Sequence, residues 1–421
     1  MSSTLVMKFG GTSVADAERI KCAAQRIVAK HDAGYRVVVV LSARGKTTDE
    51  LIAMADEVSD TPDAREMDML LSTGERISCA LCAMAINDLG HQALSLTGSQ
   101  AGIVTDTSHT KARIIDVRAD RITEALDAGK VVLVAGFQGV STSRDVTTLG
   151  RGGSDTTAVA LAAALDAEEC EIYTDVAGVF SADPRIVPNA RKLPIVSFDE
   201  MLEMSASGAG VLQLRSVEYA RNHGVRIHCR SSLEDGAGTV VVSEQETMER
   251  PLVTAVTHTV AESRVTLLGV PDEPGIAARI FGALAEANVN VDMIIQNEPL
   301  TDGRRADMSF TVAHEDSRAA NAALQPVVEE FGIDDVTTDE NTGKVSIVGA
   351  GMRSHPGVAA KVFKVLGDAG INIQMISTSP IKISCVIALD RVPEAVRSLH
   401  DAFGLAGEDT ILLEDPFAGP V

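Results

Sequence analysis

Residues 148–157 combine the residue types that bind anions. Three glycines surround Arg151 in this segment, and Ser154 and Asp155 then lead into the apolar run Ala158–Leu165. Serine is a favourable N-cap residue, so we expect a helix to begin at Ser154. Free amides and the positive end of the helix dipole favour an anion there, and the guanidinium of Arg151 matches a carboxylate or phosphate. An ordinary strand-to-helix turn has the same pattern, so similar turns elsewhere in the chain decide the interpretation.

Two further small, polar turns follow predicted strands. Gly10–Ser13 comes directly after the apolar segment Leu5–Phe9, and Ser42–Gly45 follows the buried run Val37–Leu41. Ligands of open α/β sheets bind at the carboxyl ends of the strands. The sequence therefore predicts an anion site at this edge of a sheet. Gly45 begins a Gly-Lys-Thr triplet, but Val40 occupies the place of the first P-loop glycine, which argues against that motif.

Strands alternate with helices through the first half of the chain, which predicts a mostly parallel sheet covered on both faces. The expected helices are residues 15–30 and 65–89, the second with Gly74 and Glu75 inside it. The further expected strands are Val131–Ala135, Glu171–Thr174, Gly224–Cys229 and Thr239–Val242.

Composition limits the classes of partner. The chain has 421 residues, which favours two or three domains, and its net charge of −22 opposes binding to nucleic acid or anionic membranes. The first residues do not resemble a signal peptide, and Val37–Leu41 is far too short to cross a bilayer. We therefore expect a cytoplasmic protein.

The six cysteines lie in apolar surroundings, and Cys79 and Cys82 are expected to be core thiols rather than metal ligands.

The second half contains an internal repeat. Residues 265–269 match residues 345–349, and the Pro-Gly pair at 274–275 matches the pair at 356–357. Each copy is predicted to form a strand, a Pro-Gly turn, a helix, an Asn-containing strand and a further helix. Two copies favour a pair of small α/β sandwiches over a solenoid, which needs more repeats. Glu244–Pro251 is expected to be a charged hinge before them.

Together these motifs resemble those of the aspartate kinase family, whose members combine an amino-acid kinase domain with two C-terminal ACT domains. The resemblance covers essentially the whole chain. It is carried by Lys8–Ser13, Ser42–Ala43, Thr47–Asp49, Thr73–Glu75, Gly150–Thr157, Tyr173–Asp175 and Asp183–Arg185.

The resemblance implies a three-layer αβα kinase domain with a mostly parallel sheet, followed by two ferredoxin-like βαββαβ ACT domains. The implied boundaries are 1–245 for the kinase domain, 246–263 for a linker and first ACT strand, 264–340 for the first ACT domain and 341–421 for the second. The implied reaction transfers the γ-phosphoryl group of ATP to the side-chain carboxylate of L-aspartate, the first step of aspartate-family amino-acid biosynthesis. ACT domains imply feedback by lysine, threonine or both, and a homodimer or larger homo-oligomer.

The resemblance also implies roles for individual residues. A carboxylate with a pKa near ~3.9 is ionised at neutral pH, so the acceptor needs no general base, and the site must instead offset repulsion between two anions. Magnesium would arrive with ATP, held by phosphate oxygens without a dedicated protein site.

The implied catalytic residues are Lys8, Gly11 and Asp155. The implied aspartate contacts are Ser42, Thr48, Glu75, Arg151 and Ser154, with Arg151 on a carboxylate and Glu75 on the α-ammonium. The implied ATP contacts are Lys8, Gly10, Gly11, Ser13, Thr174, Asp175, Phe180, Asp183, Arg185 and Gly210. The implied effector contacts are Asp272, Gly275, Ala277, Gln296, Asn372, Ile373 and Ser379.

The chain departs from the family pattern at several positions. Gly210 replaces a lysine that contacts ATP phosphates in the family, which predicts weakened ATP handling, whereas Arg44 replaces a methionine and would supply a substitute charge. Gln374 and Pro380 stand where glutamates are common. Loss of these carboxylates predicts reduced or altered inhibition by lysine. The changed segment Glu298–Pro299 belongs to the same prediction.

Two alternatives to this activity stay open at this point. One is a related kinase of a specialised pathway that phosphorylates another amino-acid carboxylate. The other is a catalytically weak amino-acid sensor in which the ACT domains carry the function, including an internally started regulatory subunit beginning at Met248.

Overall fold

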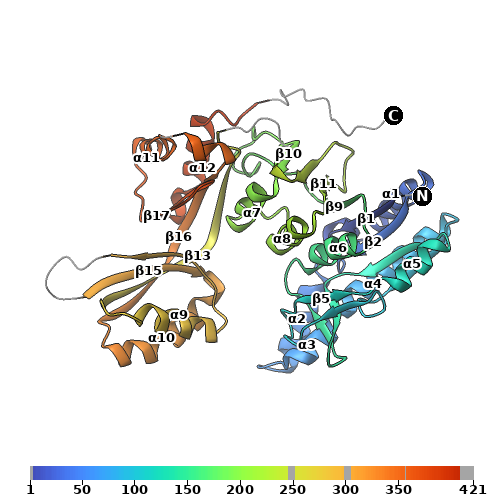
Figure 1. Ribbon diagram of the computed structural model, residues 1–421, viewed down its shortest axis with the longest axis horizontal. Helices are drawn as coiled ribbons and strands as arrows, with labels where there is room; N and C mark the ends of the chain where they lie inside the picture. The colour runs from blue at the N-terminus through green and yellow to red at the C-terminus, as the bar shows by residue number, and fades with distance from the viewer. Residues whose placement is uncertain (1–2, 245–251, 298–304, 356, 408–421) are drawn as a thin grey trace. The chain divides into compact units, whose positions relative to one another are not determined.

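The computed structural model describes residues 3–244, 252–297, 305–355 and 357–407. The chain forms two compact units, which are labelled by element in Figure 1. The first comprises Met1–Val179, Lys192–Ala206 and Gly210–Glu249, and the second comprises Phe180–Arg191, Ser207–Ala209 and Arg250–Val421. The hinge expected at Glu244–Pro251 and the residues Met248 and Glu298–Pro299 fall, except for Glu244, outside the described residues.

The first unit is built on an eight-stranded sheet with the order β10-β12-β11-β9-β1-β2-β6-β3. Neighbouring strands are parallel except β11 and β12. The mostly parallel sheet is therefore confirmed. The strands are β1 (Thr4–Phe9), β2 (Arg36–Leu41), β3 (Ala93–Leu96), β6 (Val131–Ala135), β9 (Glu169–Thr174), β10 (Ile195–Ser197), β11 (Ile227–Ser231) and β12 (Thr239–Val242).

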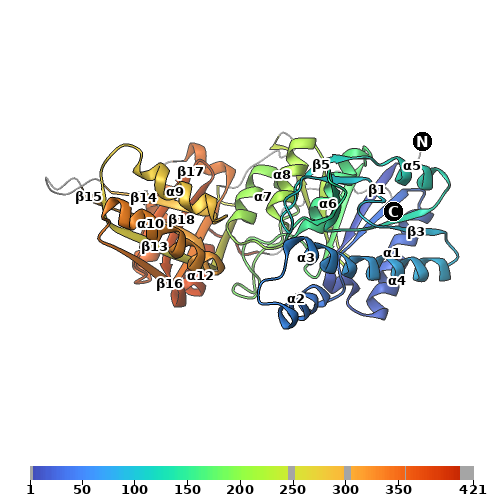
Figure 2. The ribbon, with the colours of Figure 1, turned by 90° about the horizontal axis from the view of Figure 1, so that it is seen from below.

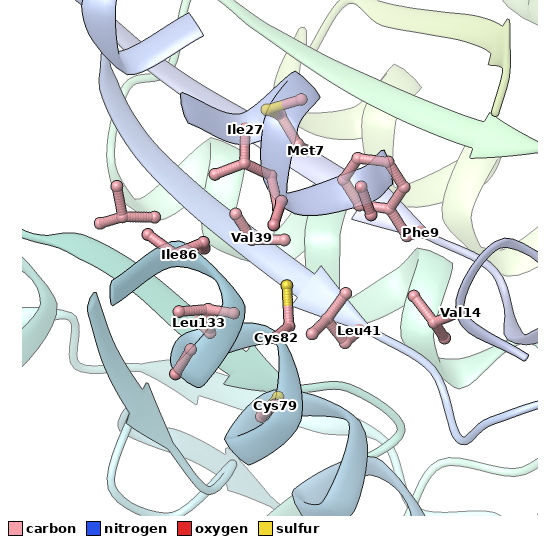
Figure 3. Packing of buried hydrophobic residues seen from close by; sticks show 14 of the residues in the cluster. Met7, Phe9, Val14, Ile27, Val39, Leu41, Cys79, Cys82, Ile86 and Leu133 are labelled. Carbon is pink, nitrogen blue, oxygen red and sulfur yellow. The ribbon is translucent and has the colours of Figure 1, made fainter. Parts of the chain in front are cut away.

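Helices cover both faces of this sheet, as Figure 2 shows. α1 and α4 pack on one face, where Ile27, Cys82 and Ile86 meet Met7 and Val39 of the central strands (Figure 3). α6 contacts β1, β2 and β9 and is buried over most of its length. The helical segments are η1 (Gly11–Val14), α1 (Ala17–Asp32), α2 (Thr47–Val58), α3 (Ala64–Leu71), α4 (Thr73–Asp88), α5 (Asp120–Asp127), α6 (Gly153–Ala164), α7 (Phe198–Ala206) and α8 (Leu214–His223).

Several predicted element boundaries differ from the structure, including those of the helix expected at residues 15–30, which is α1 (Ala17–Asp32), and three of the differences have a clear local cause. The helix expected at Ser154 begins at Gly153, because Gly152 occupies the N-cap with φ 71° and turns the chain early. The strand expected from Gly224 begins at Ile227, because α8 runs to His223 and Gly224 is its left-handed C-cap.

The third wrong boundary concerns residues 65–89, where Ser72 separates α3 from α4. The combined segment Ala64–Asp88 is long enough to cross a membrane, and its mean hydropathy is 1.3. Half of that window is buried inside the protein. We therefore assign it as a core segment of the first unit.

A smaller sheet with the order β5-β4-β7-β8 was not predicted. β8 is important for the site because it leads directly into the glycine-rich segment around Arg151. Its strands are β4 (Ile103–Thr105), β5 (Ile114–Val117), β7 (Gln138–Ser141) and β8 (Val146–Thr148).

The second unit contains an antiparallel sheet with the order β14-β15-β13-β16-β18-β17. Its two long central strands are each shared by the two repeats. Residues 264–268 of β13 pair with the first part of β16, and residues 255–259 pair with the last part. The elements are β13 (Ala255–Pro271), α9 (Ile276–Glu286), β14 (Val291–Gln296), β15 (Arg305–Ala313), η3 (His314–Asp316), α10 (Ser317–Phe331), β16 (Asp335–Val348), η4 (Ala350–Ser354), α11 (Val358–Asp368), β17 (Met375–Ser379), β18 (Lys382–Ala388), η5 (Leu389–Arg391) and α12 (Val392–Ala402).

The cysteines fit the prediction of core thiols with one exception. Cys79 and Cys82 are buried on α4, and burial raises the pKa of Cys82 to about 12. Such thiols stay protonated and unreactive. Cys22 on α1 is exposed, so the expectation of apolar surroundings was wrong for this residue.

Candidate active site

The predicted catalytic residues Lys8 and Asp155 lie in direct contact. Lys8 is near the carboxyl end of β1, and Asp155 is in the first turn of α6. Lys8 Nζ and Asp155 Oδ1 are 2.5 Å apart, and both side chains are largely buried. The carboxylate therefore holds the ammonium in place at the edge of the sheet where the small, polar turns were expected.

Glycines allow the surrounding turns to approach each other closely. A Cβ atom on Gly11 would lie 2.7 Å from the carbonyl oxygen of Ala43, and one on Gly136 would lie 2.7 Å from Ser154 Oγ. Gly10 would place a Cβ atom 3.7 Å from Lys8 Nζ. The turns after β1, β2 and β6 and the start of α6 are therefore packed into one region. Gly74, which was expected inside a longer helix, lies in the first turn of α4, and it has the same role, since its Cβ would be 2.8 Å from that of Ala43.

Glu75 brings a buried carboxyl group to the same region. It is only 3% exposed, and its Oε1 accepts a hydrogen bond of 3.3 Å from the backbone amide of Ala43. Its Oε2 has no partner among the described residues. Burial raises its pKa to about 7, although the Ala43 amide and the charge of Arg76 act in the opposite direction. A ligand that donates hydrogen bonds would satisfy the free oxygen.

Arg151 has an exposed side chain, for which the described residues supply no hydrogen-bond or ion-pair partner. Its backbone is fixed, because Gln213 Nε2 donates to the Arg151 carbonyl oxygen at 2.9 Å. Ser154, the other predicted substrate contact on this segment, is 6% exposed. The arrangement presents a cation on a rigid backbone.

The remaining predicted contacts of the first unit follow strand ends. Ser42 follows β2, and Thr48 is in the first turn of α2; both are partly buried. Ser13 donates to Ser232 Oγ at 2.7 Å, and Ser232 Oγ in turn donates to the carbonyl oxygen of Thr174 at 3.0 Å. Thr174 Oγ1 also donates to the carboxylate of Asp175. Ser232 was missed from the sequence, although it is a small polar residue directly after β11.

Other predicted nucleotide contacts belong to the second unit. These are Phe180, Asp183 and Arg185, all within Phe180–Arg191. The carboxylate of Asp183 pairs with the guanidinium of Arg185 at 2.7 Å, and these hydrogen bonds lower the pKa of Asp183. Their assignment to ATP stays a prediction.

Gly210 lies exposed in the first unit. Arg44 Nη2 donates to the carbonyl oxygen of Ala15 at 3.1 Å, and its Nε has no partner among the described residues. The Arg44 guanidinium is thus partly engaged by a backbone carbonyl group, which limits its availability to replace the missing lysine charge at the ATP site.

The predicted effector contacts are mostly surface residues of the two repeats in the second unit. Gly275 is the left-handed N-cap of α9 with φ 100°, and Gly357 has the same place before α11 with φ 98°. The repeat therefore extends to the conformation of this turn. Asp272 and Ala277 flank Gly275, Gln296 ends β14, Asn372 and Ile373 precede β17, and Ser379 ends β17.

Acidic and histidine clusters with metal-ligand geometry occur elsewhere in the described residues. They are His31 with Asp32 and His91, and Glu169 with Glu171 and His228. The Glu171 carboxylate already pairs with Lys30 at 2.8 Å. Neither cluster contains a predicted site residue.

Comparison with known proteins gives the class of this fold and site. The profile of the amino acid kinase family matches residues 3–231, and ACT domain profiles match residues 264–329 and 345–403. These matches define a kinase domain followed by two ACT domains.

Relatives then specify the family. The aspartokinase of Mycolicibacterium smegmatis is 57% identical over 408 residues, which cover 96% of this chain and 97% of that protein. The crystal structure of E. coli aspartokinase III in complex with aspartate and ADP is 26% identical, with a TM-score of 0.81 over 95% of this chain and 99% of that chain. Its complex with lysine and aspartate, also 26% identical, has a TM-score of 0.73 and covers 96% and 100%. The chain belongs to the aspartokinases, and it is a kinase that uses ATP.

Proposed function

We propose that the region around Lys8, Asp155, Glu75 and Arg151 is where this aspartokinase transfers the γ-phosphoryl group of ATP to the side-chain carboxylate of L-aspartate. The observation that carries the proposal is Oε2 of the buried Glu75, which is unpaired within the described part of the chain and lies in the same packed set of turns as the Lys8–Asp155 pair. An α-ammonium group would satisfy that oxygen, and the exposed Arg151 would bind a carboxylate of the same substrate.

The proposed chemistry is electrostatic. The acceptor carboxylate is already ionised, so the site has to reduce its repulsion from the phosphates. Lys8 supplies a positive charge whose position Asp155 fixes at 2.5 Å. The Gly10 amide already donates to the Tyr173 carbonyl oxygen at 3.2 Å, so the amide of Gly11 is the one that can approach an oxygen, because no side chain intervenes. Magnesium would arrive as an ion carried by the ATP phosphates, whose oxygens would hold it.

The test measures ADP release and traps the acyl phosphate with hydroxylamine. L-Aspartate, L-glutamate and N-acetyl-L-aspartate are compared as acceptors. We expect turnover with L-aspartate, and a large loss with N-acetyl-L-aspartate in the wild type because it lacks the ammonium. Preference for another acceptor would favour the related carboxylate kinase, and absence of ADP formation with every acceptor would favour the amino-acid sensor.

Amino-acid effectors at the ACT repeats and a homo-oligomer in the cytoplasm complete the proposal. The crystal structure of E. coli aspartokinase III in complex with lysine and aspartate supports effector binding in this family. Sedimentation of the full chain with and without lysine and threonine tests the assembly.

A further inference from the structure

Asp68 on α3 is a buried carboxylate that the proposed chemistry does not use. It is 0% exposed. Its Oδ1 accepts hydrogen bonds from the backbone amide of Thr110 at 3.0 Å and from Thr148 Oγ1 at 2.5 Å. Its Oδ2 lies 2.6 Å from His109 Nδ1. A buried carboxylate is costly unless it is well paired. These hydrogen bonds join α3 to two segments, residues 109–112 and residues 148–150.

Arg215 on α8 contacts the same two segments. Its Nη1 donates to the carbonyl oxygen of Leu149 at 2.6 Å, and its Nη2 donates to that of Ala112 at 3.1 Å. Burial lowers its pKa from the usual arginine value, with the nearby charge of Arg113 acting in the same direction. The planar fork of a guanidinium is suited to bridging two carbonyl oxygens.

These contacts end immediately before Arg151. The two joined segments also bind each other, because the Ala112 amide donates to the Thr148 carbonyl oxygen at 2.9 Å. The next glycine, Gly150, has φ 77°, and a Cβ atom there would lie 3.2 Å from the Thr110 carbonyl oxygen. Thr110, whose backbone amide donates to Asp68, therefore packs closely against the turn that carries Arg151.

We propose that Asp68 and Arg215 are positioning residues for the aspartate contact Arg151, holding its turn from α3 on one side and α8 on the other. The inference rests on the proposed role of Arg151 in binding aspartate. Neither residue needs to touch substrate. Both act by fixing the backbone of residues 148–150, so that the guanidinium of Arg151 projects from a rigid base and loses little freedom when it binds.

The test separates positioning from general stability. Asp68→Asn keeps the size of Asp68 but removes its charge, which weakens the hydrogen bonds from Thr110 and Thr148, and replaces the oxygen next to His109 by an amide nitrogen. Arg215→Lys keeps the charge but cannot bridge the carbonyl oxygens of Leu149 and Ala112 as a guanidinium does. We expect each to raise the KM for aspartate about tenfold, with the KM for ATP and kcat changed by less than about twofold. Asp63→Ala is the matched control, because Asp63 caps the same helix through the amides of Arg65 and Glu66. It should lower the midpoint of thermal unfolding without changing the KM for aspartate.

Thr148→Val provides a second route if Asp68→Asn does not fold. It removes only the hydroxyl that contacts Asp68, and the double variant should show less than the sum of the two effects on the aspartate KM. If Asp68→Asn and Thr148→Val change this KM no more than Asp63→Ala does, the positioning role is wrong.

Arg151→Ala distinguishes this failure from failure of the proposed function. An unchanged aspartate KM in Arg151→Ala would reject the substrate role of Arg151 and, with it, the inference. A raised KM in Arg151→Ala alone, with no effect of the other variants, would reject only the positioning role.

Discussion

At the scale of single residues, Glu75 should make aspartate binding depend on pH. Burial raises its pKa to about 7 from 4.5, which corresponds to a cost of ionisation on the order of 3 kcal/mol. The neutral form cannot pair with an ammonium. We therefore expect kcat/KM for aspartate to fall about tenfold for each pH unit below about 7. Glu75→Gln should have lower activity, and its kcat/KM should not fall in this way below about pH 7. Glu57→Gln, on the exposed face of α2, should keep the pH dependence of the wild type.

The same residue gives a stability prediction of definite sign. Between pH 4.5 and about 7 the folded protein keeps a proton on Glu75 that the unfolded chain has lost. The contribution of Glu75 to stability is therefore greatest below pH 4.5 and declines as the pH rises to about 7. The midpoint of thermal unfolding of the ligand-free wild type should fall relative to Glu75→Gln across this interval. A constant difference would contradict the raised pKa.

Gly210 allows the missing family lysine to be restored. Its side-chain position is open, because no atom lies within 4 Å of a Cβ atom built there. If the lysine contacts phosphate, one charge-assisted hydrogen bond contributes about 1.5–3 kcal/mol, or roughly ten- to hundredfold in rate. Gly210→Lys should therefore improve the ATP KM or kcat. Gly236→Lys adds the same charge at another exposed, open glycine and should have no effect. No gain in Gly210→Lys would reject the prediction of weakened ATP handling.

At the scale of elements, Lys344 links three strands of the ACT sheet. It lies on β16 and is 1% exposed, and its Nζ pairs with Glu262 Oε1 of β13 at 2.5 Å and with Asp292 of β14. Burial would lower the pKa of Lys344, but the two carboxylates outweigh it and raise the pKa. Lys344→Met would leave Glu262 without its buried partner, which should cost about 2–4 kcal/mol.

The corresponding measurement is thermal unfolding of the full chain. The ACT transition should shift down by about 5 °C or more in Lys344→Met. Lys364→Met removes a lysine whose pair with Asp368 is largely exposed, so it should change the midpoint little. Equal shifts in the two variants would show that the Lys344 cluster contributes no more than a surface ion pair.

Elements differed in how far the sequence could predict them. β1, β2 and β6 were predictable because a strand buried on both faces appears as a continuous apolar run. β8 was missed because Val146–Thr148 is short and polar, and only its pairing with β7 defines it. The glycine-rich motifs made Lys8 and Arg151 candidate site residues, because glycines next to a cation are typical of anion sites. Asp68 and Arg215 were not predictable, because isolated polar residues on helices carry no signal until distant segments come together.

At the scale of the whole molecule, the repeat predicted two ACT copies but not their shared strands. Residues 255–259 precede the first copy, yet they pair with the last part of β16, from which the second copy continues. Pairing between residues about ninety positions apart is set by tertiary structure rather than local pattern. The two ACT copies consequently form one continuous sheet. A ligand that stabilises the strands of one copy therefore also stabilises the shared strands of the other.

Gln374 provides the test of effector recognition in this sheet. Its backbone amide donates to the carbonyl oxygen of Val386 at 2.8 Å, and its Oε1 is buried without a partner among the described residues. A glutamate is common at this position in the family, and a carboxylate there would pair with an effector ammonium. We therefore expect weak inhibition by lysine alone in the wild type and stronger inhibition in Gln374→Glu. A buried carboxylate without a partner is costly, so the variant should also unfold at a lower temperature and regain stability when lysine is added.

Titration of activity with lysine, threonine and both together, in parallel with thermal unfolding, measures these effects. Lys382→Gln, on β18 of the same copy, controls for a change of one charge unit in the same direction. Strong inhibition of the wild type by lysine alone would contradict the prediction. A Gln374→Glu variant that loses stability but does not regain it with lysine would show that the oxygen at this position faces no effector, because binding to the folded state alone must raise the unfolding temperature.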